Sequence, residues 1–229
     1  MDAFDTGVIV RSLPFLWKGM QYTITLTLTA MVGGIFFGTL LAMARLSSIK
    51  PVAWIAAGYV NVLRSIPLVL VIFWFYFLVP LISQWITGAP RPVPVGPDKT
   101  ALVTFTIFEA AYYCEIMRAG IQSIPRGQVF AGQALGLNYW QTMANVVLPQ
   151  AFRNMVPILL TQTIILFQDT SLVYVISVTD FLGAASKVAQ RDSRLVEMYT
   201  FVALVYFVIS FTLSQIVRYL QARMAVPSR

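Results

Sequence analysis

Long runs without a charged side chain constrain this chain more than any other feature. Residues 19–44 and 198–217 contain no Asp, Glu, Lys or Arg. A helix rises about 1.5 Å per residue and the hydrocarbon layer is about 30 Å thick, so about 20 apolar residues cross it. Only 11% of the chain is charged, whereas soluble domains carry about 25%. The sequence therefore predicts an all-α integral membrane protein.

Five membrane spans are predicted, and together they form a single transmembrane domain over residues 1–229. The third span carries Glu109, Glu115 and Arg118, and the fourth carries Asp169. An odd number of spans places the two ends of the chain on opposite sides of the membrane. The predicted spans cover about 19–44, 54–81, 100–119, 155–178 and 198–217.

The basic residues alone do not orient the chain. Lys and Arg outside the spans divide almost equally between the two sides, so the positive-inside rule gives no decision. The net charge of +7 is scattered between apolar runs, which argues against nucleic acid as a partner. One side holds Arg45, Lys50, Arg118, Arg126, Arg153, Arg218, Arg223 and Arg229; the other holds Arg11, Lys18, Arg91, Lys99, Lys187, Arg191 and Arg194, with acidic residues such as Asp2.

Cysteine and histidine usage excludes several kinds of site. Cys114 is the one cysteine and the chain has no histidine. A disulfide framework and the common zinc sites are therefore excluded, and no imidazole is present to act as a general base. We expect Cys114 to serve in packing and predict no metal site.

A stripe of small residues marks the first span. Ala30, Gly34, Gly38 and Ala42 follow one another at intervals of four. Small residues at this spacing let a second helix approach closely in lipid. Two interpretations are open: the stripe packs inside the subunit's own bundle, or it meets another subunit.

A polar segment interrupts the apolar chain between the third and fourth spans, over 127–154. Ser123 and Pro125 are typical of a helix start, and an apolar face repeats at Phe130 and Leu135 opposite Gln128 and Gln133. Gly136 suits a left-handed helix end. Asn138 and Gln141 have capping-box spacing, and Pro149 disturbs the helix that follows. We expect two short amphipathic helices that either lie on the membrane or dock on another protein.

The segment "FAGQALGLNYWQTMANVVLP" resembles the cytoplasmic loop of permease subunits of ATP-binding-cassette importers, with the pattern E-A-A-x3-G-x9-I-x-L-P. Gly136 takes the glycine position, and 146–149 takes the I-x-L-P position. Phe130 and Gly132 depart from the usual glutamate and alanine. By this resemblance the residues that contact an ATPase are Ala131, Gly132, Ala134, Leu135, Gly136 and Leu137.

Four further blocks extend the resemblance to nearly the whole chain: "NVLRSIPLVLVIFWFYFLVP", "FEAAYYCEIMRAGIQSIPRGQ", "LPQAFRNMVPILLTQ" and "FQDTSLVYVI". They resemble the polar amino acid branch, and glutamate/aspartate importer permeases in particular. The resemblance implies the type I importer fold in a bacterial inner membrane, with an external N-terminus. The loop 120–152 would be a cytoplasmic coupling helix. It also implies a second permease subunit, two ATPase subunits that bind ATP and Mg²⁺, and an external solute-binding protein.

No G-x-x-x-x-G-K-[ST] sequence occurs in the chain, so it has no phosphate-binding loop of this kind. We therefore expect no cofactor in this chain, and an ATPase partner as the energy source.

Charges within spans need partners or a pathway, because each costs about 2.5–3.5 kcal/mol on insertion scales. Glu115 and Arg118 are spaced to pair on one helix. Arg64 precedes Pro67, and a proline in a span frees a carbonyl, so a helix break there is an alternative to a continuous span.

Polar residues of the fourth span form the candidate substrate site. Gln162 and Asp169 are seven apart and share a helix face, as do Thr161 and Gln168. An amino acid needs an anion for its ammonium and a cation for its carboxylate, which favours Asp169 and Arg64. A structural bridge from Arg64 to Asp169 or Glu109 is the alternative. The candidate pathway residues are Arg64, Glu109, Gln162, Asp169, Thr170 and Ser171.

Three functions are open for these residues. The first is a permease for a polar, acidic amino acid that works by alternating access. The second is a mainly structural subunit whose paired permease makes the substrate contacts. The third is an intramembrane enzyme that uses Glu109, Glu115 and Asp169 as acid–base groups. No activated nucleophile or metal-ligand cluster accompanies these residues in the sequence, which argues against it.

Overall fold

The computed structural model describes residues 4–224, and every regular element in that range is a helix. Asp2 and Arg229 lie outside the described residues. The predicted all-α class is confirmed. In chain order the elements are α1 (Thr6–Arg45), α2 (Lys50–Arg64), α3 (Leu68–Phe73), the π-helix η1 (Trp74–Leu78), α4 (Val79–Thr87), α5 (Pro97–Gln122), α6 (Arg126–Ala134), α7 (Tyr139–Thr142), the π-helix η2 (Met143–Val147), α8 (Leu148–Asp169), the 3-10 helix η3 (Thr170–Ile176), α9 (Phe181–Asp192) and α10 (Leu195–Met224).

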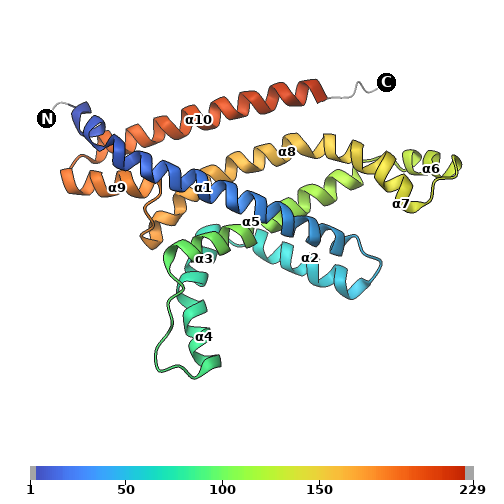
Figure 1. Ribbon diagram of the computed structural model, residues 1–229, viewed down its shortest axis with the longest axis horizontal. Helices are drawn as coiled ribbons and strands as arrows, with labels where there is room; N and C mark the ends of the chain where they lie inside the picture. Colours follow the sequence, from blue (N-terminus) through green and yellow to red (C-terminus); the bar gives the residue numbers. More distant parts are fainter. Residues whose placement is uncertain (1–3, 225–229) are drawn as a thin grey trace.

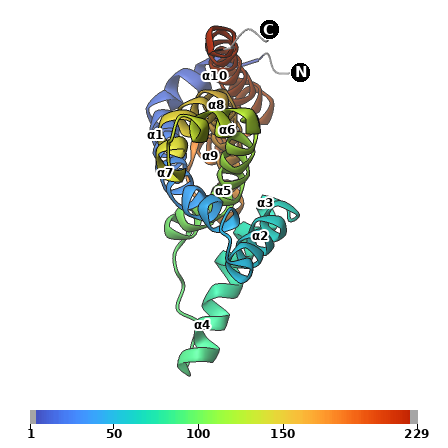
Figure 2. The ribbon, with the colours of Figure 1, turned by 90° about the vertical axis from the view of Figure 1, so that its right-hand side faces the viewer.

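Four long helices, α1, α5, α8 and α10, extend along the long axis of the molecule (Figure 1). Helices α6 and α7 form the tip of one end, where the link from α1 to α2 also lies. Helix α9 packs against α1 and α10 at the opposite end. Helix α4 projects away from the long helices, as the second view shows (Figure 2). Helices α6 and α7 are thus far from α9.

Four stretches are long and apolar enough to cross a membrane: Thr6–Arg45, Leu68–Thr87, Tyr139–Ile176 and Leu195–Met224. The predicted third span lies in α5, which is not among them and which carries Glu109, Glu115 and Arg118. Helix α5 contacts α1, α2, α3 and α8. Other helices therefore cover much of its surface, and charged residues in membrane segments favour such covered positions.

The predicted second span, 54–81, is not one helix. Helix α2 ends at Arg64, and α3 begins at Leu68 after Pro67, which stands at its N-cap. The N–H groups of Ser65 and Ile66 donate to carbonyls of the preceding turn, which closes α2. Proline has no N–H to continue the helix, so the chain turns here. The break that Pro67 suggested is present.

The predicted fourth span, 155–178, belongs to a longer helical run that starts at Tyr139. Pro149 disturbs this run as expected: the π-helix η2 lies just before it, and α8 begins at Leu148 without a break in the helical run. The wider turn accommodates a residue that lacks an N–H donor. The second helix of the polar segment is therefore continuous with the span that follows.

A proline-rich link, with Pro90, Pro92 and Pro94, joins α4 to α5. Residues 83–87 belong to α4 and 97–99 to α5, so only 88–96 are irregular. Gly88 ends α4 in the left-handed conformation, with φ 66°.

The small-residue stripe of α1 packs within the subunit. A Cβ atom added to Gly38 would lie 2.8 Å from Cβ of Tyr113 and 3.0 Å from the backbone oxygen of Ala110. One added to Gly34 would lie 2.9 Å from the Tyr113 ring and 3.0 Å from Cβ of Glu109. The backbones of α1 and α5 thus approach closely along this stripe. Of the two interpretations of the stripe, packing inside the subunit's own bundle is the one that the structure shows.

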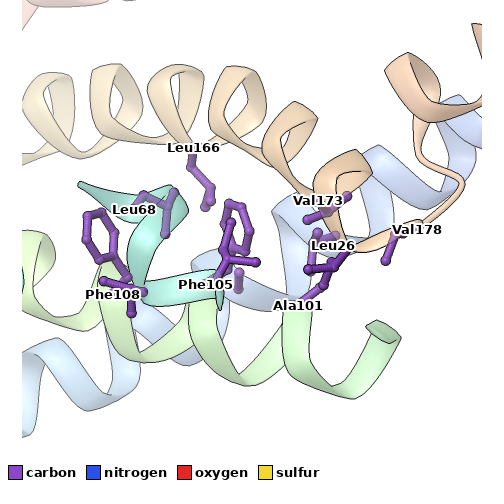
Figure 3. Packing of buried hydrophobic residues seen from close by; sticks show 12 residues of the cluster. Leu26, Leu68, Ala101, Phe105, Phe108, Leu166, Val173 and Val178 are labelled. Atoms are coloured by element: carbon purple, nitrogen blue, oxygen red, sulfur yellow. The ribbon is translucent and has the colours of Figure 1, made fainter. Parts of the chain in front are cut away.

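The main core lies where α1, α3, α5, α8 and η3 meet (Figure 3). Phe105 of α5 is fully buried among Leu26 of α1, Leu68 of α3 and Leu166 of α8. Val173 of η3 and Val178 close one side. This core holds the inner ends of α3 and η3 against α5, next to the polar residues described below.

Candidate functional site

The elbow, defined here as residues 126–142, turns as the sequence predicted. Gly136 has φ +79°, in the left-handed region. The capping box is formed: the N–H of Gln141 donates to Oδ1 of Asn138 over 2.9 Å, and the N–H of Asn138 donates to Oε1 of Gln141 over 3.0 Å. Both features fix the direction in which α7 leaves the turn.

Ser123 does not cap α6, contrary to expectation. Pro125 occupies the N-cap position, and no side chain caps that helix. Ser123 instead stands at the end of α5, where its hydroxyl donates to the carbonyl of Gly120 over 2.7 Å. It also accepts from Nδ2 of Asn154 over 3.0 Å. The hydroxyl thus ties α5 to α8 rather than starting α6.

A separate small core attaches the elbow to α5 and α8. Its buried members are Ile124, Val147, Ala151 and Met155, with Val129 of α6 and Ile121 of α5 packed against them. A Cβ atom on Gly120 would lie 2.1 Å from Cγ of Met155, so Met155 lies directly on the glycine. The elbow is therefore packed against both helices through one shared core.

Gly132 differs from the other residues proposed to contact an ATPase, because it is buried. A Cβ atom there would lie 2.9 Å from Cγ2 of Thr142. Gly132 therefore lets α6 and α7 close on one another and does not face outward. Ala131, Ala134, Leu135 and Gly136 are exposed, and Leu137 is half-buried.

The apolar face of the elbow is uncovered. Leu135 is 82% exposed and Trp140 is 77% exposed, and Phe130 and Tyr139 are also exposed. An apolar face of an amphipathic helix is normally covered by the protein core, and grouped exposed apolar residues mark interaction surfaces. The elbow tip has the properties of a docking surface.

Gly136 offers a direct prediction about this turn. Nothing lies within 4 Å of an added Cβ atom, so the constraint is its φ of +79°. A side chain in the left-handed region costs about 1–2 kcal/mol, and Asn tolerates it better than a β-branched residue. We expect Gly136→Asn to retain most transport and Gly136→Val to lose most of it in an uptake assay. Equal loss in both variants would show that contact, and not backbone conformation, matters at Gly136.

A cluster of charges joins three helices between the core and the elbow. The predicted pair of Glu115 with Arg118 is present. Arg45, the last residue of α1, also donates to Glu115, and Nη1 of Arg64 lies 3.8 Å from Oε2 of Glu115. The sequence did not predict this role for Arg45, which was counted only among the basic residues that orient the spans. Its position directly after the first uncharged run was the one sequence feature that could have indicated a charge at the end of that helix.

Arg64 makes neither of the bridges considered from the sequence. Within residues 4–224 its carboxylate neighbour is Glu115, and no ion pair with Asp169 or Glu109 forms. Its guanidinium carbon lies 5.4 Å from the ring centroid of Tyr112. The structure thus holds Arg64 beside α5, by a carboxylate and an aromatic face.

Glu109 lies deeper and is fully buried. Nε2 of Gln162 donates to both of its carboxyl oxygens, over 3.1 and 3.3 Å. One turn away, the hydroxyls of Tyr113 and Thr163 are 3.1 Å apart. Two polar contacts therefore join α5 to α8 inside the bundle, which explains how α5 holds a buried carboxyl group.

The remaining candidates lie at the end of α8. Asp169 and Ser171 are half-buried. Thr170 is fully buried, and its hydroxyl donates to the carbonyl of Phe167 over 2.7 Å. Thr170 therefore closes the helix end, whereas the polar side chains of Thr161 and Gln168 are exposed along α8. Exposed polar groups in a span favour a water-filled route or a subunit contact over lipid.

A family described as "Binding-protein-dependent transport system inner membrane component" matches residues 34–226. The chain belongs to this family. It is a transport subunit of the inner membrane and not an enzyme, so the intramembrane-enzyme alternative is wrong. As an importer permease it works with a solute-binding protein and an ATPase.

Named relatives match over nearly full length. The glutamate/aspartate import permease protein GltK of Escherichia coli O6:H1 is 55% identical over 98% of this chain and 100% of its own length. The glutamine transport system permease protein GlnP of Escherichia coli K12 is 33% identical, over 97% and 99%. The L-cystine transport system permease protein TcyB of Bacillus subtilis 168 is 32% identical, over 92% and 87%.

A solved structure supports the same fold. An amino acid ABC transporter crystallised with histidines has a chain that superimposes with a TM-score of 0.87 at 29% identity, covering 97% of this chain and 100% of that one. The predicted type I importer permease fold is confirmed.

Proposed function

We propose that this subunit carries an acidic amino acid, glutamate or aspartate, across the membrane by alternating access. The 55% identity to GltK over nearly the whole chain carries the proposal. The cationic surroundings of Glu115 agree with it, because arginines from three helix regions lie beside the polar face of the bundle. A solute with two carboxylates, one ammonium and a net negative charge is attracted to such a region.

The complete importer in this proposal contains a second permease, identical or homologous, with two ATPase subunits and an external solute-binding protein. ATP and Mg²⁺ bind to the ATPase subunits, and this chain holds no cofactor. The N-terminus is external and the elbow is cytoplasmic. The uncovered apolar face at Leu135 and Trp140 supports an ATPase as the partner of the elbow.

Coupling in this proposal is mechanical. Closure of the ATPase dimer moves the elbow, and the small core around Met155 passes that movement to α5 and α8. These two helices carry Glu109, Glu115, Gln162 and Asp169. Movement of the elbow therefore changes the position of the polar residues relative to one another and to the second permease.

In this proposal charged groups of the solute contact residues of opposite charge. Arg64 binds a carboxylate of the solute, because its side chain is 39% exposed and its Nη1 lies 3.8 Å from the nearest carboxylate oxygen, of Glu115. Asp169 binds the ammonium group, Ser171 supplies a neutral hydrogen bond, and Gln162 offers its amide oxygen, because its Nε2 already donates to Glu109. Thr170 does not contact the solute, because its hydroxyl already donates to the carbonyl of Phe167 and stabilises the helix end beside Asp169.

We expect Arg64→Gln and Asp169→Asn to raise the KM for glutamate at least about tenfold, the equivalent of one lost charged hydrogen bond of about 1.5–3 kcal/mol. The measurement is uptake by the reconstituted importer in vesicles. Asp192→Asn is a matched control, because Asp192 pairs with Arg191 at the opposite end. Unchanged KM in both variants would favour a mainly structural subunit whose partner binds the solute.

A further inference from the structure

The charge cluster around Glu115 holds more positive than negative charge. Arg45, Arg64 and Arg118 bring three guanidinium groups to a single carboxylate. Arg45 and Arg64 each lie in the last turn of a helix, and a helix C-terminus is equivalent to about half a negative charge. Two such ends offset about one charge, so about one positive charge is left over. That excess equals one additional carboxylate.

The hydrogen-bond donors of the cluster also exceed its acceptors. Nε of Arg118 is buried and donates to no acceptor within residues 4–224. Buried donors normally have a partner, so this one indicates a missing acceptor. The charge balance and the donor balance therefore point to the same kind of group, an anion with free oxygen atoms.

The three arginines are not held equally. Arg45 and Arg118 donate hydrogen bonds to Glu115, and their side chains are 14% and 27% exposed. Arg64 lies at 3.8 Å without a hydrogen bond and is the most exposed of the three. It is also the last residue of α2, immediately before the break at Ser65 and Pro67. Arg64 is therefore the member that can turn away from Glu115 at least cost.

We propose that Glu115 is an internal carboxylate that competes with a carboxylate of the solute for Arg64. This inference rests on the proposed function, in which Arg64 meets the solute. In the empty transporter Glu115 attracts Arg64 toward α5. An arriving carboxylate takes Arg64, and Glu115 keeps Arg45 and Arg118. When Arg64 returns to Glu115, the solute loses its cation and is released. Glu115 is thus a positioning residue that sets affinity and release without touching the solute.

The test is Glu115→Gln in the complete reconstituted importer, with glutamate and glutamine as the solutes. The substitution removes the competing charge, so we expect the KM for glutamate to fall about tenfold and the maximal rate to fall as well, because release slows. If the KM for glutamine falls in parallel, Arg64 contacts the α-carboxylate of the solute. If only the KM for glutamate falls, Arg64 contacts the side-chain carboxylate. A KM for glutamate that stays unchanged or rises overturns the proposal.

A second variant covers failure of the first to fold. Glu115→Gln combined with Arg118→Gln removes one charge of each sign, keeps the net charge of the cluster and leaves Arg64 without its competitor. The same fall in KM is expected, and its absence contradicts the proposal. Arg64→Gln distinguishes failure of this inference from failure of the proposed function. If Arg64→Gln raises the KM for glutamate while the Glu115 variants leave it unchanged, only this inference fails. If Arg64→Gln also leaves the KM unchanged, the proposed binding of the solute by Arg64 fails.

Discussion

We expect Leu135→Asp to abolish most ATP-driven uptake while the permease still inserts and folds. Leu135 is 82% exposed at the elbow tip, so the change costs the isolated subunit almost nothing. In an ATPase groove the leucine contributes about 1.5–3 kcal/mol, and an unpaired aspartate there adds a further cost. Uptake is therefore expected to fall by about tenfold to a hundredfold or more. Vesicle uptake and co-purification of the ATPase measure the two consequences.

Ile49→Asp is the matched control for this variant. Ile49 is also an exposed apolar residue at the elbow end of the molecule, in the link from α1 to α2. It precedes α2 at the N-cap, where aspartate is favourable. Uptake by this variant should match the wild type. Equal losses in both variants would show that a charge anywhere at this end disturbs transport, and would remove the special role of Leu135.

Gly38→Leu has the largest expected effect on stability. A Cβ atom at Gly38 already lies 2.8 Å from Cβ of Tyr113 and 3.0 Å from backbone atoms of Ala110 and Cys114. Backbone atoms cannot turn aside as a side chain does, so α1 and α5 must separate. Overpacking of this kind costs about 1–3 kcal/mol and more where the backbone must move. The purified permease in detergent should unfold at a clearly lower temperature.

Gly58→Leu provides the comparison within the same chain. Gly58 lies in α2, and nothing is found within 4 Å of an added Cβ atom. Leucine is the better helix former by about 0.5–1 kcal/mol, so this variant should be as stable as the wild type or slightly more so. If both glycine variants lose stability alike, the close approach of α1 to α5 does not explain the stripe.

Regular periodicity and local chemistry made the helical class and the elbow predictable. The uncharged runs identified α1 and α10, and Gly136 with the Asn138 capping box identified the turn. These features depend on neighbours within a few residues, which the sequence shows directly. The pairing of Glu115 with Arg118 belongs to the same group, because both residues lie on one helix.

Features that depend on distant parts of the chain were not predictable in the same way. The partner of Arg64 lies 51 positions further along the chain, and only the packing of α2 on α5 brings the two together. Ser123 resembles a cap for α6 in the sequence, but in the structure its hydroxyl accepts from Asn154 of α8. Pro149 indicated a disturbed helix, but the sequence did not show that the disturbance is a π-turn over Met143–Val147. Tertiary contacts decided the cases of Arg64 and Ser123.

The most direct test is a cross-link from the elbow to the ATPase in the assembled importer. Cys114 is fully buried, so a cysteine introduced by Leu135→Cys is the accessible thiol within residues 4–224. The account predicts a covalent adduct with the ATPase subunit, and no labelling by a membrane-impermeant thiol reagent added outside intact cells. Labelling from outside, or no adduct with any ATP-hydrolysing subunit, would contradict it.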